Sequence, residues 1–145
     1  MVSKTVRDEL RDRINTIEES YESFLAYAAQ GLAGDAVAKW GGQVRDYLKR
    51  SDAALTGLAD LFTSFVKQEN PQSPDRYYSF IAVLERDARD AQTAVQLVLA
   101  QATISSQLID NLNASIHLRA LLTDIFLIDE SMKLQAQEAS DPSVS

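Results

Sequence analysis

One stretch of this chain limits its possible folds more than any other. Between Pro74 and Pro142 there is neither a glycine nor a proline. These two residue types are the strongest local interrupters of regular structure, so their absence over a long run favours helix. Apolar residues in this run recur at spacings of three and four, which is the repeat of an amphipathic helix. The sequence therefore predicts an all-α protein.

A cluster of hydroxyl side chains divides this run. Thr103, Ser105 and Ser106 prefer helix caps to helix interiors, and the apolar register shifts at the same place. Without a break the chain would be a helical hairpin plus one helix of about 90 Å, at 1.5 Å per residue. We favour the break over this alternative, with helices over residues 74–103 and 106–137.

The first helix is expected over residues 4–30. It carries one apolar stripe, and either Ser3 or Thr5 can cap its start because both have side-chain oxygens that accept from the first turn. Gly31 is suited to end it, since glycine adopts the left-handed conformation that closes many helices.

The second helix is expected over residues 35–68. Its apolar register continues through the glycine pair at 41–42, and a turn there would reset that register. An alternative ends a helix near Arg50, with Ser51 or Asp52 capping a new one. We favour the continuous helix.

Four segments of similar length predict an antiparallel, up-and-down four-helix bundle, because matched helices can pack along their whole length. We expect one domain over residues 1–138 and a disordered tail over 139–145. The helices are predicted at about 4–30, 35–68, 74–103 and 106–137.

Composition argues against several classes of function. The formal net charge of −7 repels phosphate backbones, so we expect no nucleic-acid partner. The chain has no cysteine, which excludes disulfides and thiolate chemistry. We find no signal-peptide core and no apolar run that could span a bilayer. The expectation is a cytoplasmic protein with no membrane contact.

No motif for catalysis or for a cofactor is present. A di-iron bundle needs two Glu-x-x-His pairs, whereas this chain has one histidine, His117, with Ala114 three residues before it. We therefore predict a non-enzyme that holds no metal, haem or other cofactor. A minor alternative is a pH-sensitive seam of Asp110, His117 and Asp124, which share one face of an uninterrupted last helix.

The last helix carries more apolar surface than a monomeric bundle requires. This excess predicts a non-catalytic adaptor, regulatory or assembly subunit that acts through protein contacts and forms a homodimer. The tyrosine next to Tyr77 points off the apolar stripe of its helix and is an expected anchor for a partner. The predicted contact residues are Ile109, Leu112, Ile116, Phe126, Leu127 and Tyr78.

The alternative function is that of a ligand-binding bundle. Asn111 and Ser115 fall inside the apolar arc of the last helix, and Trp40 is the chain's single tryptophan. Together they are candidates for a polar layer or for the lining of a small internal cavity.

Overall fold

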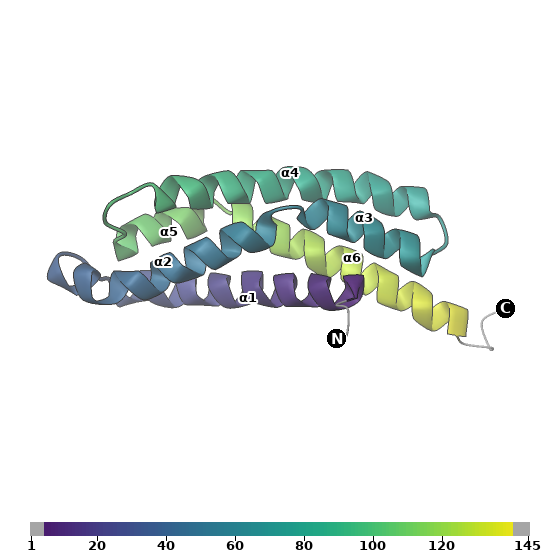
Figure 1. Ribbon diagram of the computed structural model, residues 1–145, viewed down its shortest axis with the longest axis horizontal. Coiled ribbons are helices and arrows are strands. Elements are labelled where there is room, and N and C mark those ends of the chain that lie inside the picture. Colours follow the sequence, from purple (N-terminus) through teal and green to yellow (C-terminus); the bar gives the residue numbers. More distant parts are fainter. Residues whose placement is uncertain (1–4, 141–145) are drawn as a thin grey trace.

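The computed structural model describes residues 5–140 of the chain. Within these residues there are six helices and no strand, which confirms the prediction of an all-α protein (Figure 1). The helices are α1 (Val6–Gln30), α2 (Asp35–Leu55), α3 (Leu58–Glu69), α4 (Pro74–Leu99), α5 (Ser106–Ala114) and α6 (His117–Ser140).

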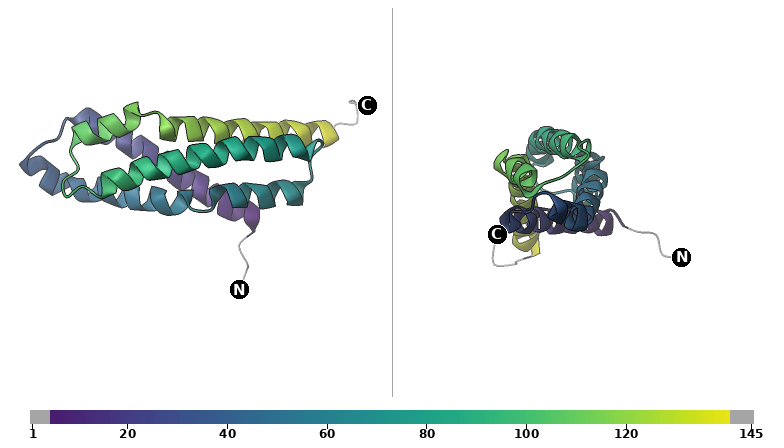
Figure 2. Two further views of the ribbon diagram at one scale, coloured as in Figure 1. Left: turned by 90° about the horizontal axis from the view of Figure 1, so that it is seen from above. Right: turned by 90° about the vertical axis from the view of Figure 1, so that its left-hand side faces the viewer.

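Most of the helices run close to the long axis of the molecule around a shared centre, and α1 crosses them obliquely (Figure 2). α2 and α3 follow one another along the length of the molecule, and so do α5 and α6. α1 packs against α2, α3 and α5, whereas α4 packs against α2, α3 and α6. Every helix contributes fully buried apolar side chains to a single core, which stabilises the fold by removing apolar surface from water. Examples, one from each helix, are Ile17, Leu48, Phe62, Leu84, Ile109 and Ile125.

The ends of α1 lie where the sequence indicates. The Thr5 side chain accepts a hydrogen bond from the Asp8 amide at 3.0 Å, so Thr5 is the N-cap. Gly31 follows the last turn in the left-handed conformation, with φ of 64°. Similarly, Pro74 opens α4.

The prediction of one helix over residues 35–68 is wrong. The helix does continue through the glycine pair at 41–42, but it ends at Leu55, and Gly57 turns the chain with φ of 71° before α3 begins. The sequence conceals this break because Leu55 and Leu58 are both buried, so the apolar register is the same on either side of it.

Side chains from two neighbouring helices bind the polar groups that this break exposes. The Gln92 side-chain amide of α4 donates to the Asp52 carbonyl oxygen at 3.1 Å and to the Thr56 hydroxyl at 2.9 Å. From α1, the Arg13 guanidinium donates to the Thr56 carbonyl oxygen. These bonds satisfy backbone and side-chain groups at a helix end, where the helix itself supplies no partner.

The prediction of one helix over residues 106–137 is also wrong. The chain breaks at Ser115 and Ile116, and Ile116 adopts a left-handed conformation with φ of 63°. The break lets α5 pack against α1 while α6 packs against α4, which a continuous helix would not allow. α6 continues to Ser140, so the first two residues of the predicted tail are helical, and the other five lie outside the described residues.

The predicted break around residues 103–106 is confirmed, and a set of hydrogen bonds fixes the chain there. The buried Ser106 hydroxyl donates to the Tyr27 carbonyl oxygen at 2.6 Å and accepts from the Leu32 amide at 2.8 Å. The Ser106 amide donates to the Leu32 carbonyl oxygen at 3.1 Å. The Tyr27 hydroxyl donates to the Ile104 carbonyl oxygen at 2.5 Å. We call these bonds the Ser106 latch, which joins the start of α5 to the end of α1.

Arg45 of α2 closes the other side of the same turn. Its guanidinium donates to the Leu99 carbonyl oxygen at 3.0 Å and to the Gln101 carbonyl oxygen at 2.7 Å. A cation is favourable here because the carbonyl groups at a helix C-terminus carry partial negative charge.

Ser106→Ala tests the latch. The variant leaves the Leu32 amide and the Tyr27 carbonyl without their hydroxyl partner, and unsatisfied buried groups of this kind cost about 1–3 kcal/mol. Urea unfolding followed by circular dichroism should show that loss. Ser64→Ala is the matched control, because that exposed hydroxyl bonds only the Asp60 carbonyl of its own helix. Equal effects of the two substitutions would contradict the latch.

Candidate functional site

The outer side of α6 exposes an unusual amount of apolar surface. Phe126, Leu127 and Leu134 are 51%, 55% and 50% exposed, and Ile116, just before the helix, is 57% exposed. The core contacts of α6 lie on its opposite side. They are made by Leu118, Leu121, Leu122, Ile125, Ile128 and Met132.

The exposed residues fall into a regular stripe. From Ile116 the stripe advances by alternating steps of four and three residues, which is the seam spacing of helices that pair side by side. Phe126 lies beside the stripe. We call the stripe the α6 outer face, formed by Ile116, Ala120, Thr123, Leu127, Glu130 and Leu134.

Ile116 has both an unfavourable backbone conformation and an unfavourably exposed side chain. A left-handed backbone costs a residue other than glycine about 1–2 kcal/mol, and a branched β-carbon adds to this. Its apolar side chain is also more than half exposed. A conformation of this kind persists where the surrounding structure imposes it and often marks a functional position.

The structure corrects two of the predicted contact residues. Ile109 and Leu112 are 0% and 5% exposed, because α5 turns them toward α1 and into the chain's own core. They are not available to a partner. Tyr78 is half-buried and packs against the core, so it is a poor anchor. Leu134, which the sequence analysis missed, lies seven residues after Leu127 on the same side of the helix.

The predicted polar layer does not form. Asn111 is exposed, and its side-chain oxygen accepts a hydrogen bond from Gln107 of the same helix. The Ser115 hydroxyl donates to the Leu112 carbonyl oxygen at 2.6 Å, so it serves the end of α5. Trp40 lies on α2, which is not among the helices that pack extensively against α5.

The predicted seam of Asp110, His117 and Asp124 is likewise interrupted. Asp110 is exposed on α5, whereas His117 and Asp124 are half-buried on α6, beyond the break. Asp124 instead meets Asp87 of α4, a residue that the sequence analysis did not single out. The only signal for it was the position of Asp87 beside the buried residues of its own helix.

Asp87 and Asp124 form a carboxyl pair between α4 and α6. The Asp124 Oδ2 atom is buried, and no donor among the described residues reaches it. Burial, and then the nearby Asp87 carboxyl with its like charge, raise the pKa of Asp124 from 3.8 to about 7. Two carboxyls can hydrogen-bond only when one of them is protonated. This site therefore holds a proton close to neutral pH.

Asp124→Asn tests the pair. The folded chain binds this proton more tightly than the unfolded chain, whose aspartate has a pKa of about 3.9. The stabilisation is thus full below about pH 4 and is lost as pH rises through about 7. The asparagine amide donates to Asp87 at every pH, so at pH 8 the variant should be more stable than wild type by about 1 kcal/mol. Urea unfolding at pH 5 and pH 8 measures this.

Asp90→Asn, at an exposed position of the same helix as Asp87, should leave the pH dependence unchanged. If Asp124→Asn has the same slope of stability against pH as wild type, the shared proton does not exist.

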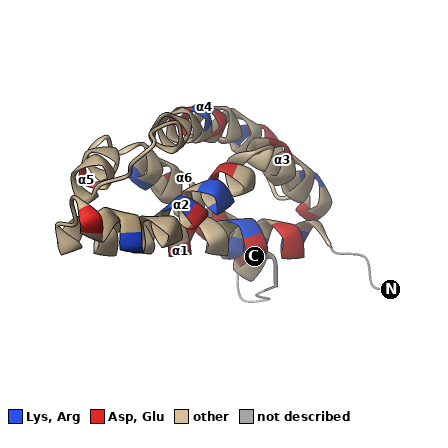
Figure 3. Ribbon diagram, turned by 60° about the vertical axis from the view of Figure 1, so that its left-hand side comes forward, with Lys and Arg blue, Asp and Glu red and all other residues tan. Residues whose placement is uncertain are grey.

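Charged residues elsewhere are interleaved by sign along the helices (Figure 3). Several form exposed ion pairs one helical turn apart, and such pairs contribute little to stability because solvent screens them. They include Arg50–Asp46, Arg89–Glu85 and Lys133–Asp129, each between 2.7 and 2.9 Å, whereas the Arg13–Glu9 pair, at 2.9 Å, is half-buried.

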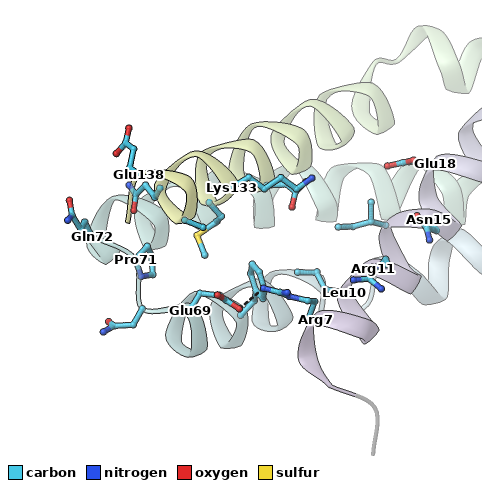
Figure 4. Close-up of a pocket in the computed structure, with 17 residues that line it drawn as sticks. Arg7, Leu10, Arg11, Asn15, Glu18, Glu69, Pro71, Gln72, Lys133 and Glu138 are labelled. Carbon is cyan, nitrogen blue, oxygen red and sulfur yellow. Dashed lines mark hydrogen bonds and ion pairs between the residues drawn. The ribbon is translucent and has the colours of Figure 1, made fainter. Parts of the chain in front are cut away.

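A hollow of about 1030 Å³ lies between α1, α3 and the second half of α6. Figure 4 shows the residues that surround it, with Arg7 of α1 paired to Glu69 of α3 at 2.9 Å. Leu10 and Met132 are buried at its apolar side. Lys133 is also paired, with Asp129 of its own helix. Two of the ion pairs at the hollow are therefore internal, while Glu18 and Glu138 are further acidic residues of its lining.

Over residues 5–140, no three histidine, aspartate or glutamate side chains come together as metal ligands. None of the helices in this range is both long and apolar enough to cross a membrane. Comparison with known proteins finds no matching family model, no matching curated protein and no matching solved structure.

Proposed function

We propose that this protein is a non-catalytic adaptor or assembly subunit that acts through the α6 outer face. One observation carries the proposal. Half of the large apolar side chains that the described residues expose lie on α6 or immediately before it. Apolar side chains gathered on one side of one helix are typical of a surface that a protein partner covers. The cytoplasm remains the predicted compartment.

We also propose that the six helices act as four antiparallel rods, the up-and-down bundle that the sequence predicts. In this description α2 with α3 form one rod and α5 with α6 form another. The support is that the members of each pair follow one another along the long axis, and that the helices on either side of each break bury apolar residues in the same core. α6 is then a corner helix with one side free.

The partner that fits the α6 outer face best is a second copy of the chain. An antiparallel, two-fold pairing of two α6 helices places residues of one copy opposite different residues of the other. When Ile116 faces Leu134 of the second copy, Thr123 faces Leu127. The face is about 27 Å long at 1.5 Å per residue, so the contact is continuous but narrow, and we expect a micromolar Kd.

The charges on this face support the same register. Arg119 and Glu130 are exposed, and within residues 5–140 neither belongs to a salt bridge. Glu130 belongs to the stripe, at the edge nearest Phe126, and Arg119 lies just outside that same edge. In the antiparallel register, Arg119 of one copy comes within reach of Glu130 of the other, and the two-fold symmetry repeats the pair. This charge complementarity favours the second copy over an unrelated partner.

A charge exchange tests the register. Arg119→Glu and Glu130→Arg should each weaken dimerisation about tenfold, because each places like charges opposite one another twice. The double variant should restore the wild-type Kd, since it exchanges the two signs. Sedimentation equilibrium across the micromolar range measures the Kd, and Arg86→Glu on the exposed side of α4 is the charge control.

Two results would contradict this proposal. If the wild-type chain stays monomeric throughout the micromolar range, the proposed dimer does not form. If the double variant dimerises as weakly as either single variant, the proposed antiparallel register is wrong, even if a dimer forms.

Ile116→Gly separates stability from association. Glycine adopts a positive φ without strain, and this relief exceeds the added entropy of the unfolded chain, so the variant should be more stable by about 1 kcal/mol. The same change removes an apolar side chain from the contact, so the dimer should weaken. Unfolding at low protein concentration and sedimentation at high concentration measure the two effects. A less stable variant would show that Ile116 serves the fold rather than a partner.

A further inference from the structure

A second hollow, of about 700 Å³, lies between α1 and α2. This hollow is lined by residues of α1 and α2, whereas the α6 outer face is formed by α6 and the residue before it. The two surfaces therefore belong to different helices. The α1 side of this hollow includes the small side chains of Ser23 and Ala26, and its α2 side includes the aromatic rings of Trp40 and Tyr47. We call it the α1–α2 groove, lined by Glu19, Glu22, Ser23, Ala26, Trp40 and Tyr47.

The aromatic rings of the groove already attract cations from their own helix. The Lys39 ammonium lies 5.1 Å from the centre of the Trp40 ring, and the Arg50 guanidinium lies 4.4 Å from the centre of the Tyr47 ring. Ring faces carry negative electrostatic potential, so they bind cations. Trp40 is nevertheless 51% exposed, so much of its surface remains open to a ligand.

The charged side chains that line the groove are acidic, although the Lys39 ammonium and the Arg50 guanidinium lie at its aromatic wall. Its lining includes two carboxylates, Glu19 and Glu22, and no lysine or arginine. Glu22 is exposed and is in no salt bridge with another described residue. Anionic groups beside an exposed aromatic ring form a surface that is complementary to an organic cation.

The neighbouring Arg50 shows how a guanidinium is held by a ring and a carboxylate together on this helix. Its guanidinium stacks on Tyr47 while two of its nitrogens donate to the Asp46 carboxylate at 2.7 and 2.9 Å. A planar guanidinium makes both contacts at once, whereas a lysine ammonium is a more strongly hydrated point charge. The groove presents the same two kinds of partner to a guanidinium. Trp40 supplies a ring from α2, and Glu22 supplies a carboxylate from α1.

We propose that the α1–α2 groove binds an arginine-bearing segment of a partner protein. The guanidinium stacks on Trp40 and pairs with Glu22. This goes beyond self-association through α6 and does not depend on it, because the two surfaces involve different helices. A chain with both surfaces has the two contacts that an adaptor needs.

The single tryptophan makes the proposal directly measurable. The probe is an acetylated and amidated peptide of alternating glycine and arginine, added to the full chain. We expect a saturable change in Trp40 fluorescence that weakens as salt is raised, because salt screens exposed charges. The corresponding lysine peptide should bind more weakly, and the glutamate peptide should not bind.

Substitutions then locate the binding site. Glu22→Gln should weaken arginine-peptide binding about threefold, a typical effect for an exposed ion pair. Glu18→Gln is the matched control, because it removes the same charge from the same helix but lines the hollow beside α6 instead. Trp40→Phe and Trp40→Ala, measured by calorimetry, should weaken binding progressively in that order. Circular dichroism checks that each variant is folded.

The proposal is overturned if millimolar arginine peptide leaves Trp40 fluorescence unchanged. It is equally overturned if Glu22→Gln and Glu18→Gln weaken binding alike, since the peptide would then sense only the net charge. A chain that fails to dimerise but passes these tests would remove the proposed function and leave this inference standing.

Discussion

After α4 the chain turns back along the bundle, and the Ser106 latch fixes where α5 begins. Burying a hydroxyl stabilises a fold only when its hydrogen-bonding capacity is met, and here the backbone of α1 meets it. The Ser106 hydroxyl donates to one carbonyl near the end of α1 and accepts from an amide beyond that end. Because Arg45 binds the carbonyls at the end of α4, both sides of the turn are fixed. The position of α5, and hence of α6, follows from these contacts.

Once α5 is held against α1, the chain must turn again to cover α4. That second turn has no glycine, so Ile116 adopts the left-handed conformation at a cost to stability. Its consequence is a last helix with two distinct sides. One side completes the core against α4, and the other exposes Leu127, Leu134 and their neighbours. The proposed dimer gives a physical reason for this arrangement, because a partner would cover apolar groups that water otherwise contacts.

Local signals predicted the features that depend on nearby residues. The Thr5 cap, the left-handed Gly31 and the start of α4 at Pro74 are of this kind. The break at Gly57 was missed because Leu55 and Leu58 are both buried in the core. The spacing of apolar residues is therefore the same as in an unbroken helix. The break at Ile116 was missed because a branched residue gives no indication of positive φ.

The candidate site divides in the same way. Ile116, Phe126 and Leu127 are exposed, as a contact surface requires, and their spacing on the helix was visible in the sequence. Ile109 and Leu112 are buried because α5 faces α1, which depends on a turn that the sequence does not reveal. The Asp87–Asp124 pair joins α4 to α6 and exists only in the folded chain. The spacing of apolar residues along one helix does not show which residues of two different helices come together.

Disulfide trapping can detect the proposed association of two copies through antiparallel α6 helices. The chain has no cysteine of its own, so introduced thiols are the only ones present. Thr123→Cys chains are mixed in equal amounts with Leu127→Cys chains under mild oxidation, and mass spectrometry identifies the products. In the antiparallel dimer, the main product should join position 123 of one copy to position 127 of the other. A product that joins only like chains, or no cross-link at concentrations where wild type is dimeric, would contradict the antiparallel dimer.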